Sequence, residues 1–307
     1  MQRIGIIANL DNPRAAEALR QVTNRAERLG LTVVGEAPAP RRVPERNARR
    51  HAAVEAALAG EIEAVVVLGG DGTLLRAAHS LRGAGLPIMG LNIGSLGYLT
   101  GVDEAHFDEA LLALRDDRFR ISERTTLAAR IVGAAGEAQT LQLNALNDVV
   151  ASRTASARLV HIGLDLNGIP VTTYACDGVV VATATGSTAY SLAAGGPILL
   201  PDTPALVINV ICPHSLGARP LVVAASSRIT LRCESASAPL LLALDGHECG
   251  RLSEGDRVEV FQGPETVRMA FLDDGDPYAV LNRKLGWGGA LAGRVRAATP
   301  EPRKAES

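Results

Sequence analysis

Residues 69–73, Gly-Gly-Asp-Gly-Thr, could form a phosphate-binding turn, because they directly follow a wholly apolar run at residues 64–68. Glycine lets the backbone approach a ligand closely, and the helix that we expect to follow directs its free N–H groups at the same point. The turn is no Walker-A loop, since Leu-Leu-Arg follows it in place of Gly-Lys-Ser/Thr. We therefore expect backbone amides, Arg76 and a metal to share the charge of a phosphate. The predicted turn residues are Gly69, Gly70, Gly72 and Thr73.

Asp71 is the residue of this turn with the most specific chemical meaning. A carboxylate beside a phosphate group repels it, unless the carboxylate binds a divalent cation or accepts the proton of a nucleophilic hydroxyl. Both of these roles belong to phosphoryl transfer. The alternative is structural, because Asp at such a turn often caps the following helix and stabilises it by about 1 kcal/mol. The turn thus predicts phosphoryl transfer with helix capping as the alternative.

Two further polar segments could recognise the acceptor. Asn147 and Asp148 precede a short apolar run, where such a pair is often an ordinary turn. The run from Asp177 to Tyr190 is less ordinary, because it joins a buried strand to closely spaced hydroxyl residues, a glycine and a tyrosine. Such a segment can direct hydroxyl and N–H groups at sugar and base atoms while the tyrosine ring stacks. The alternative is a helix capped by Ser187 or by the threonine two residues earlier.

Composition and charge argue against several classes of partner. The formal net charge is −2 and the sequence pI is about 6.3, so no basic excess is available for a nucleic-acid backbone. The four cysteines lie far apart without a CxxC pair, which indicates neither zinc nor a redox dithiol and fits a reducing cytoplasm. The chain has no secretory signal pattern and no run of the roughly 20 apolar residues that a membrane helix needs. We therefore expect a cytoplasmic protein that binds neither nucleic acid nor membrane.

Changes in periodicity predict two domains. Strands, turns and amphipathic helices alternate at first, which favours an α/β domain with a parallel, Rossmann-like sheet over residues 1–122. Short β-prone runs then replace the helical pattern, so residues 123–290 are predicted to form a β-rich, sandwich-like domain whose last part returns to the first domain. Residues 291–307 carry too little apolar surface to fold and are predicted to be a disordered tail.

Taken together, the motifs closely resemble those of the NAD kinase family, in the right order over about residues 3–290. The resemblance implies an enzyme that transfers the γ-phosphoryl group of ATP to the 2′-hydroxyl of the adenosine ribose of NAD, giving NADP and ADP. It also implies Mg²⁺ bridging the donor phosphates, phosphate-donor binding by the first domain, NAD binding by the second, and a homodimer or homotetramer. The matching segments are residues 69–73, 90–100, 147–148, 177–190, 213–216 with 219–221, and 284–288.

The resemblance implies a role for each matching polar residue. Asp71 matches the base that accepts the proton of the 2′-hydroxyl, Gly72 lies beside it, and Arg76 is suited to phosphate contact. Asn147 and the acid matching Asp148 hold the adenosine part, since a carboxylate can accept from both hydroxyls of a ribose. The family usually has Glu at this second position, so the shorter Asp148 is expected to reach the sugar through a water bridge.

The same resemblance predicts that the run ending at Tyr190 lines the dinucleotide pocket. Asp177 matches a carboxylate near the nicotinamide end, and Thr185 matches a residue of the pocket wall. Contacts to adenine and to backbone atoms are implied for Thr188, Ala189 and Tyr190.

Three other positions are assigned by resemblance alone. Tyr98 replaces the commoner Phe at an aromatic position of the pocket wall, which keeps a stacking face and adds a hydroxyl. Arg158 matches a position that contacts the dinucleotide, with a surface arginine as the alternative. His247 matches a variable polar position near the pocket, with an ordinary turn residue as the alternative. Four other histidines are isolated in the sequence and are interpreted as surface or core residues: His51, His79, His106 and His161.

Two other functions stay open from the sequence. A lipid or sugar kinase could share only the turn at residues 69–73, but its pocket would lack the adenosine-reading run at residues 177–190. A non-catalytic NAD(P)-sensing protein could bind the dinucleotide without transfer, although binding alone gains nothing from a carboxylate close to phosphate. The sequence also leaves open whether polyphosphate replaces ATP as the donor.

Overall fold

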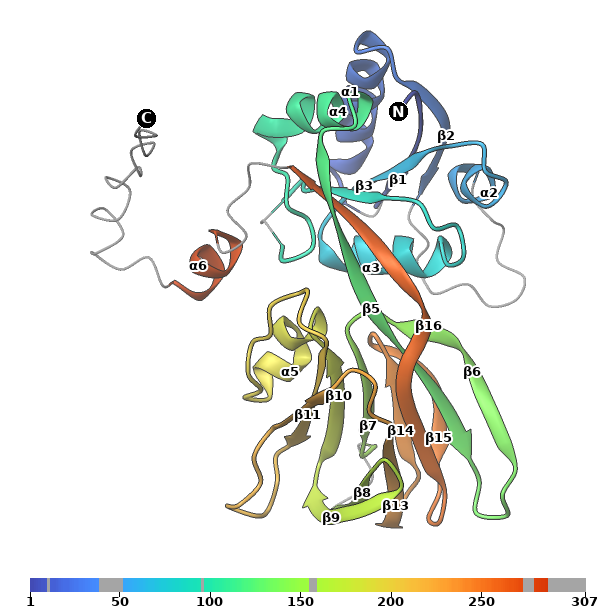
Figure 1. Cartoon of the computed structure of the whole chain (residues 1–307), viewed down its shortest axis with the longest axis vertical. Helices are drawn as coiled ribbons and strands as arrows, with labels where there is room; N and C mark the ends of the chain where they lie inside the picture. The colour runs from blue at the N-terminus through green and yellow to red at the C-terminus, as the bar shows by residue number, and fades with distance from the viewer. Residues whose placement is uncertain (10–11, 39–51, 95–96, 155–158, 273–278, 287–307) are drawn as a thin grey trace, which may run out of the picture.

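The computed structural model describes residues 1–9, 12–38, 52–94, 97–154, 159–272 and 279–286. It consists of an α/β domain and a β-sandwich that follow one another along the longest axis of the molecule (Figure 1). Two long strands, β5 (Phe119–Val132) and β16 (Arg257–Leu272), run from one domain into the other. Within the described residues, no helix is long and apolar enough to cross a membrane.

The α/β domain is built on a parallel sheet with helices on both faces. Its elements are β1 (Arg3–Ala8), α1 (Ala15–Arg28), β2 (Thr32–Pro38), α2 (Ala52–Leu58), β3 (Ala64–Leu68), α3 (Asp71–Ser80), β4 (Ile88–Leu91), η1 (Glu104–His106) and α4 (Phe107–Arg115). The strand order is β2-β1-β3-β4, with parallel pairing throughout. All residues of β3 are buried, as expected for a strand covered on both faces. Helices α1 and α4 pack on one face through Val22 and Leu111, and α2 and α3 pack on the other through Val54 and Leu74.

The second domain is a sandwich of two sheets. Its smaller sheet has the order β12-β11-β10-β7-β14-β15, and its larger sheet contains β5, β6, β8, β9, β13 and β16. The elements besides β5 and β16 are β6 (Ala138–Ala145), β7 (Asp148–Ser152), β8 (Val160–Leu166), β9 (Ile169–Cys176), β10 (Gly178–Thr183), η2 (Gly186–Thr188), α5 (Tyr190–Ala193), β11 (Ala205–Ile211), β12 (Leu221–Ala224), β13 (Ile229–Ala236), β14 (Leu240–Leu244) and β15 (His247–Leu252). Helix α6 (Ala279–Leu285) follows β16 outside the sandwich. The predicted combination of an α/β domain and a β-rich domain is confirmed.

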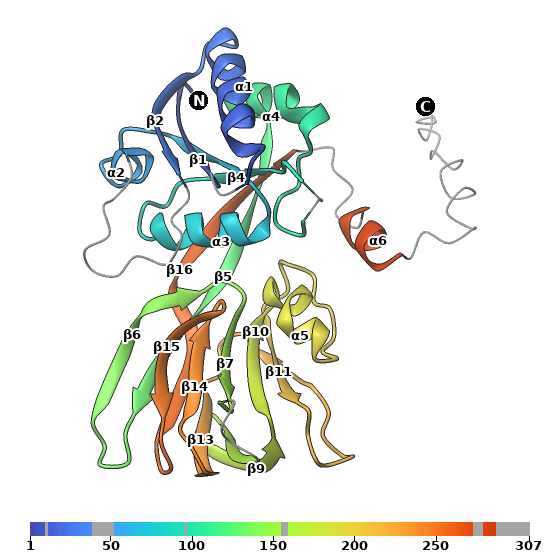
Figure 2. The same cartoon turned by 180° about the vertical axis from the view of Figure 1, so that it is seen from behind.

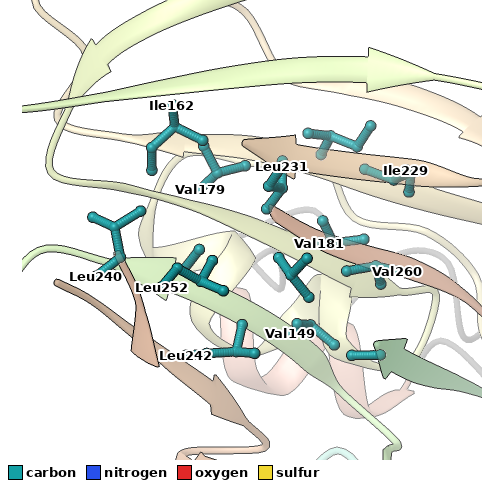
Figure 3. Close-up of a cluster of buried hydrophobic side chains, with 14 of the residues drawn as sticks. Val149, Ile162, Val179, Val181, Ile229, Leu231, Leu240, Leu242, Leu252 and Val260 are labelled. Carbon is teal, nitrogen blue, oxygen red and sulfur yellow. The ribbon is translucent and has the colours of Figure 1, made fainter. Parts of the chain in front are cut away.

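The core of the sandwich lies between the two sheets. Figure 3 shows Val181 and Leu242 of the smaller sheet facing Leu231 and Val260 of the larger one. The alternation along β14, where every second residue is buried, follows from the two-residue period of a strand with one face toward the core. Each fully buried Leu or Val contributes about 1.5–3 kcal/mol, so this core supplies the rigid frame on which the polar ends of β7 and β10 are held.

The two long strands join the domains into one continuous sheet. β5 and β16 pair antiparallel from Phe119 with Leu272 to Val132 with Arg257. The end of β16 also pairs with β4, parallel, so the sheet of the first domain continues into the larger sheet of the sandwich. Figure 2 shows both strands crossing from one domain to the other. The predicted boundary at residue 122 falls inside β5, where a continuous strand crosses it, and the domain limits stay predictions.

Helix α6, which follows β16, lies close to a residue of the first domain. The Lys284 ammonium on α6 lies 5.8 Å from the centroid of the Tyr98 ring. The predicted tail at residues 291–307 lies outside the described residues.

Candidate active site

The turn predicted to bind phosphate lies between β3 and α3. Gly70 precedes the helix with φ −98° and ψ −173°, and Asp71 is the first helical residue. A side chain at Gly69 would clash with Thr73, so the two ends of the turn are in direct contact. No described atom lies within 4 Å of a Cβ added at Gly70. This leaves space for a ligand at the positive end of the helix dipole.

The Asp71 carboxylate binds a neighbouring segment instead of capping its own helix. Its Oδ2 accepts a hydrogen bond from the backbone N–H of Tyr98 at 2.7 Å. Its Oδ1 accepts from the N–H groups of Leu99 and Thr100 at 3.0 and 3.2 Å. Gly97 makes this approach possible, since a Cβ at that position would overlap the carboxylate. Residues 69–73 and 90–100, which the sequence singled out as separate segments, are therefore joined by one carboxylate.

Two groups flank Asp71. Burial and then the charge of Asp71 raise the pKa of Tyr98, so its hydroxyl stays protonated at neutral pH and can donate a hydrogen bond. Arg76 lies one turn further along α3 and donates from Nη2 to Thr73 Oγ1 at 3.4 Å. Its buried Nε has no partner among the described residues. Arg76 thus keeps donor capacity for a phosphate group.

The turn at Asn147 and Asp148 is fixed by hydrogen bonds from both sides. The Asp245 carboxylate accepts from three consecutive backbone N–H groups, at residues 146–148, over 2.7–3.0 Å. Thr183 binds the opposite side, where its N–H donates to Asn147 O at 2.8 Å and its hydroxyl donates to the preceding carbonyl at 2.6 Å. The backbone of this turn is therefore held by Asp245 and by Thr183.

Asp148 is a buried acid beside a second carboxylate. Only 5% of the residue is exposed. Burial, and then the negative charge of Asp245, raises the pKa of Asp148 to about 7. The group therefore changes charge near neutral pH, and can donate a hydrogen bond in one form and only accept in the other.

The hydroxyl-rich run after β10 packs directly against the same turn. A side chain at Gly186 would overlap the carbonyl of Asn147, so the two backbones are in contact. The Gly186 N–H donates to Thr183 Oγ1 at 3.0 Å, and this same hydroxyl holds the turn. The two segments predicted to recognise the acceptor are therefore packed against each other.

The predicted contact residues of this run differ in exposure. Thr185 is buried, and its carbonyl accepts from Thr188 Oγ1 at 3.2 Å. Tyr190 begins α5 and is 46% exposed, which leaves its ring accessible for stacking. The capping alternatives do not hold, because Thr185 makes no side-chain cap and the Ser187 hydroxyl donates to the Ala184 carbonyl at 2.7 Å.

Helix α3 also contacts the second domain through His79. Its Nε2 lies 2.7 Å from Asp245 Oδ2, and the two side chains are 3% and 1% exposed. The ring of His247 meets the His79 ring edge to face, with 6.2 Å between centroids. Burial, and then His79, lowers the pKa of His247, so His247 is mostly neutral at pH 7 and can donate or accept.

Sequence reasoning missed Asp245, and it treated His79 as isolated. The burial of His79 fits the core interpretation, but the side chain has a carboxylate partner 166 residues away in the chain. A left-handed backbone at Asp245, with φ 47°, indicates that this turn is held by specific contacts. The Asp-Gly-His sequence of the turn was the available signal.

The structure does not bring every predicted residue to this site. Asp177 precedes β10, whereas Thr183 ends it. Six residue steps along an extended chain separate Asp177 from Thr183 by about 20 Å. The Asp177 carboxylate accepts from Arg153 Nε at 2.7 Å, and its role near nicotinamide stays a prediction. Arg158 lies outside the described residues.

Comparison with known proteins identifies the family. The model of the ATP-NAD kinase N-terminal domain matches residues 4–119, and that of the ATP-NAD kinase C-terminal domain matches residues 146–272. The NAD kinase of Moorella thermoacetica is 35% identical over 292 residues, which cover 94% of this chain and 91% of the relative. The chain belongs to the NAD kinase family. The predictions of this family, and of the phosphorylation of NAD to NADP that defines it, are confirmed.

Other members of the NAD kinase family agree in sequence and in fold. The NAD kinase of Geobacter metallireducens is 36% identical over 288 residues, or 94% of this chain and 99% of the relative. A solved structure of yeast NADH kinase complexed with NADH has a TM-score of 0.80 at 25% identity, and covers 94% of this chain and 89% of that one. An NAD kinase from Archaeoglobus fulgidus in complex with ATP, at TM-score 0.69 and 22% identity over 97% of this chain and 100% of that one, shows the fold alone.

Proposed function

We propose that this chain transfers the γ-phosphoryl group of ATP to the 2′-hydroxyl of the adenosine ribose of NAD, with Asp71 as the base. Phosphorylation of NAD to NADP is the activity of the family to which the chain belongs. The observation that carries the assignment is that α3 contacts both halves of the site. Its first residue is the candidate base, and its last turns reach the Asp245 group that holds the Asn147–Asp148 turn.

The surroundings of Asp71 support its role as a base. Both carboxylate oxygens are held by backbone N–H groups of residues 98–100, so the group needs little reorganisation when a hydroxyl approaches. Among the described residues Oδ2 accepts one hydrogen bond, and a carboxylate oxygen can accept two. Its second lone pair is the one we assign to the 2′-hydroxyl proton.

The adenosine half of NAD is assigned to the wall formed by the Asn147–Asp148 turn and the run up to Tyr190. The Asp148 carboxylate can accept from ribose hydroxyls, and the exposed Tyr190 ring offers a face for adenine. Thr188, whose hydroxyl donates to the Thr185 carbonyl, is assigned to the same wall together with Thr185. We assign phosphate contacts to Arg76, whose Nε has no described partner.

Magnesium fits this site as a companion of the donor phosphates. The described residues contain no group of three or more His, Cys, Asp or Glu side chains that could bind a metal by themselves. Mg²⁺ in kinases usually binds one or two carboxylates, several waters and the substrate phosphates. Asp71 is the carboxylate that could take part, and the bound ion would neutralise charge on the donor phosphates.

Self-association is a further part of the proposal. The sandwich exposes apolar side chains on β9 and β12, where Ile169, Val171 and Val222 are 69%, 48% and 52% exposed. Exposed apolar groups on edge strands favour contact with a second copy. Light scattering after size-exclusion chromatography tests the expected homodimer or homotetramer, and location in the cytoplasm stays a prediction from cysteine usage.

Formation of NADP from NAD, ATP and Mg²⁺ by the purified protein tests the reaction and separates it from the two alternatives. A lipid or sugar kinase, or a protein that only senses NAD(P), would form none. Replacing ATP by polyphosphate in the same assay identifies the donor.

Asp71→Asn tests the base. Turnover is expected to fall by about 100- to 10,000-fold, the range for loss of a general base, while binding of NAD stays measurable by calorimetry. Asp108→Asn is a suitable control, because Asp108 lies on α4 and pairs with Arg25 at the surface. Near wild-type turnover in Asp71→Asn would reject the role of this carboxylate.

A further inference from the structure

The His79–Asp245 pair takes no part in the proposed reaction, yet it forms a short contact of 2.7 Å between two buried side chains. The Asp245 carboxylate accepts hydrogen bonds from three backbone N–H groups at residues 146–148, and its Oδ2 lies 2.7 Å from Nε2 of His79. Since an ionised carboxylate can only accept, we assign the proton of this contact to His79 Nε2. With both side chains almost fully buried, loss of any one donor leaves a carboxylate oxygen without a replacement from water.

Helix α3 connects this pair to the candidate base. Asp71 and His79 are eight residues apart on one helix, which corresponds to about 12 Å along its axis. The helix is fixed to the sheet by the fully buried side chains of Leu74 and Ala77. It can therefore act as a rigid spacer, with the base at one end and a hydrogen bond to the second domain at the other.

We propose that His79 and Asp245 are positioning residues that align the adenosine-binding turn with Asp71 across the domain boundary. The inference rests on the proposed function and adds how the base and the adenosine-binding turn are held at a fixed distance from each other. His79 fixes Asp245 relative to α3, Asp245 fixes the backbone of residues 146–148, and that turn carries the ribose whose hydroxyl Asp71 deprotonates. Both act through other groups, because a residue about 12 Å from the base cannot reach the reacting atoms.

The chemistry of the pair indicates which substitutions are informative. Asp245→Asn turns one acceptor oxygen into an NH₂ donor that faces donors. His79→Leu keeps a side chain of similar bulk but makes it apolar and removes the donor to Oδ2. His79→Gln retains an N–H donor. A misplacement of about 1 Å can slow a reaction by about 100-fold. We therefore expect kcat to fall by about 10- to 100-fold and KM for NAD to rise by about 10-fold in His79→Leu and Asp245→Asn.

The experiment compares these three variants with wild type by kinetics and by hydrogen exchange. KM for ATP is expected to stay within about twofold, because we assign donor binding to the first domain. Backbone amides 146–148 of the ligand-free protein are expected to exchange faster in His79→Leu and Asp245→Asn. His79→Gln is expected to recover part of the lost NAD affinity and part of the protection from exchange.

Ser122→Ala is the matched control. It removes a hydrogen bond of 2.7 Å from a buried hydroxyl to Asp202, which does not touch the turn. It is expected to leave both KM values and exchange at residues 146–148 unchanged. If His79→Leu fails to fold, His79→Gln and Asp245→Asn decide the question by the same measurements.

Three results would overturn the inference. They are equal changes in KM for NAD and ATP, unchanged exchange at residues 146–148, and a His79→Gln variant no better than His79→Leu. The first is what a general loss of stability would produce. Absence of NADP formation by wild type would overturn the proposed function as well, whereas an active wild type with unaffected variants overturns this inference alone.

Discussion

Asp148→Asn would show how strongly the fold penalises a charged group in the adenosine-binding turn. Burial, and then the charge of Asp245, raises the pKa of Asp148 from 3.8 to about 7, while the unfolded chain ionises this carboxyl at its ordinary pKa. Folding therefore favours the protonated form. The stability associated with this group is complete below the ordinary pKa and is lost as the pH rises to about 7.

The size of the effect follows from the two pKa values. Each pH unit between them corresponds to about 1.4 kcal/mol, so the loss above pH 7 is on the order of 4 kcal/mol, of which about 1.6 kcal/mol is already lost at pH 5. Asparagine has no charge to bury. The stability of Asp148→Asn relative to wild type is therefore expected to increase by about 3 kcal/mol between about pH 5 and about pH 9.

Urea unfolding of both proteins at a series of pH values measures this difference. Asp103→Asn is a control of opposite sign, because the hydrogen bond from His106 lowers the pKa of Asp103. The stability from Asp103 is present above its ordinary pKa and lost as the pH falls. Asp148 is also expected to affect binding, because only its ionised form can accept from both ribose hydroxyls. KM for NAD is therefore expected to fall as the pH rises through about 7 in wild type but not in Asp148→Asn. A stability difference that is constant with pH would refute the reasoning.

Two further predictions concern glycines in close contact with the site. Gly186→Ala is expected to raise KM for NAD by about 10-fold or more, because the added methyl displaces Asn147. Gly217→Ala, whose methyl makes an ordinary 3.7 Å contact with Ser215, is the control, and equal kinetics in the two variants would contradict the packing argument. Gly97→Ala is expected to lower kcat by about 100-fold, because the methyl displaces the Asp71 carboxylate. Wild-type turnover at saturating NAD would show that this carboxylate does not act from the position it occupies.

The parts of the fold that were predicted well are those with a strong periodic signal. The apolar run at residues 64–68 is β3, and the helical pattern after it is α3. Three edge strands of the sandwich, β9, β12 and β15, carry a weak sequence signal for a physical reason. Five of the eight residues of β9 are exposed, and most residues of β12 and β15 are exposed or half-buried. Since few of these side chains enter the core, the strands need not carry the apolar alternation by which a strand is predicted. The first part of β5, which crosses between the domains, carries Arg120, Glu123 and Arg124 and therefore lacks a clear apolar alternation.

The same distinction holds for the site. Asp71 and the Asn147–Asp148 turn carry recognisable residue types at strand ends, and the sequence was sufficient to single them out. The contact between His79 and Asp245 could not be predicted, since it joins residues 166 positions apart through the docking of two domains. Local sequence reports the tendency of a segment to form a turn, but it does not report which buried side chain the turn will meet.

Two aspartates in this protein each accept hydrogen bonds from three consecutive backbone N–H groups. Their roles differ because they are buried to different extents. Asp71 accepts from the N–H groups of residues 98–100, and Asp245 accepts from those of residues 146–148. The Asp245 side chain is 1% exposed and also holds His79, so a substrate cannot reach it. Asp71 is half-buried, and its Oδ2 accepts a single hydrogen bond among the described residues. A carboxylate fixed by three N–H groups becomes a structural anchor where water and ligand are excluded, and a pre-positioned base where one lone pair stays open.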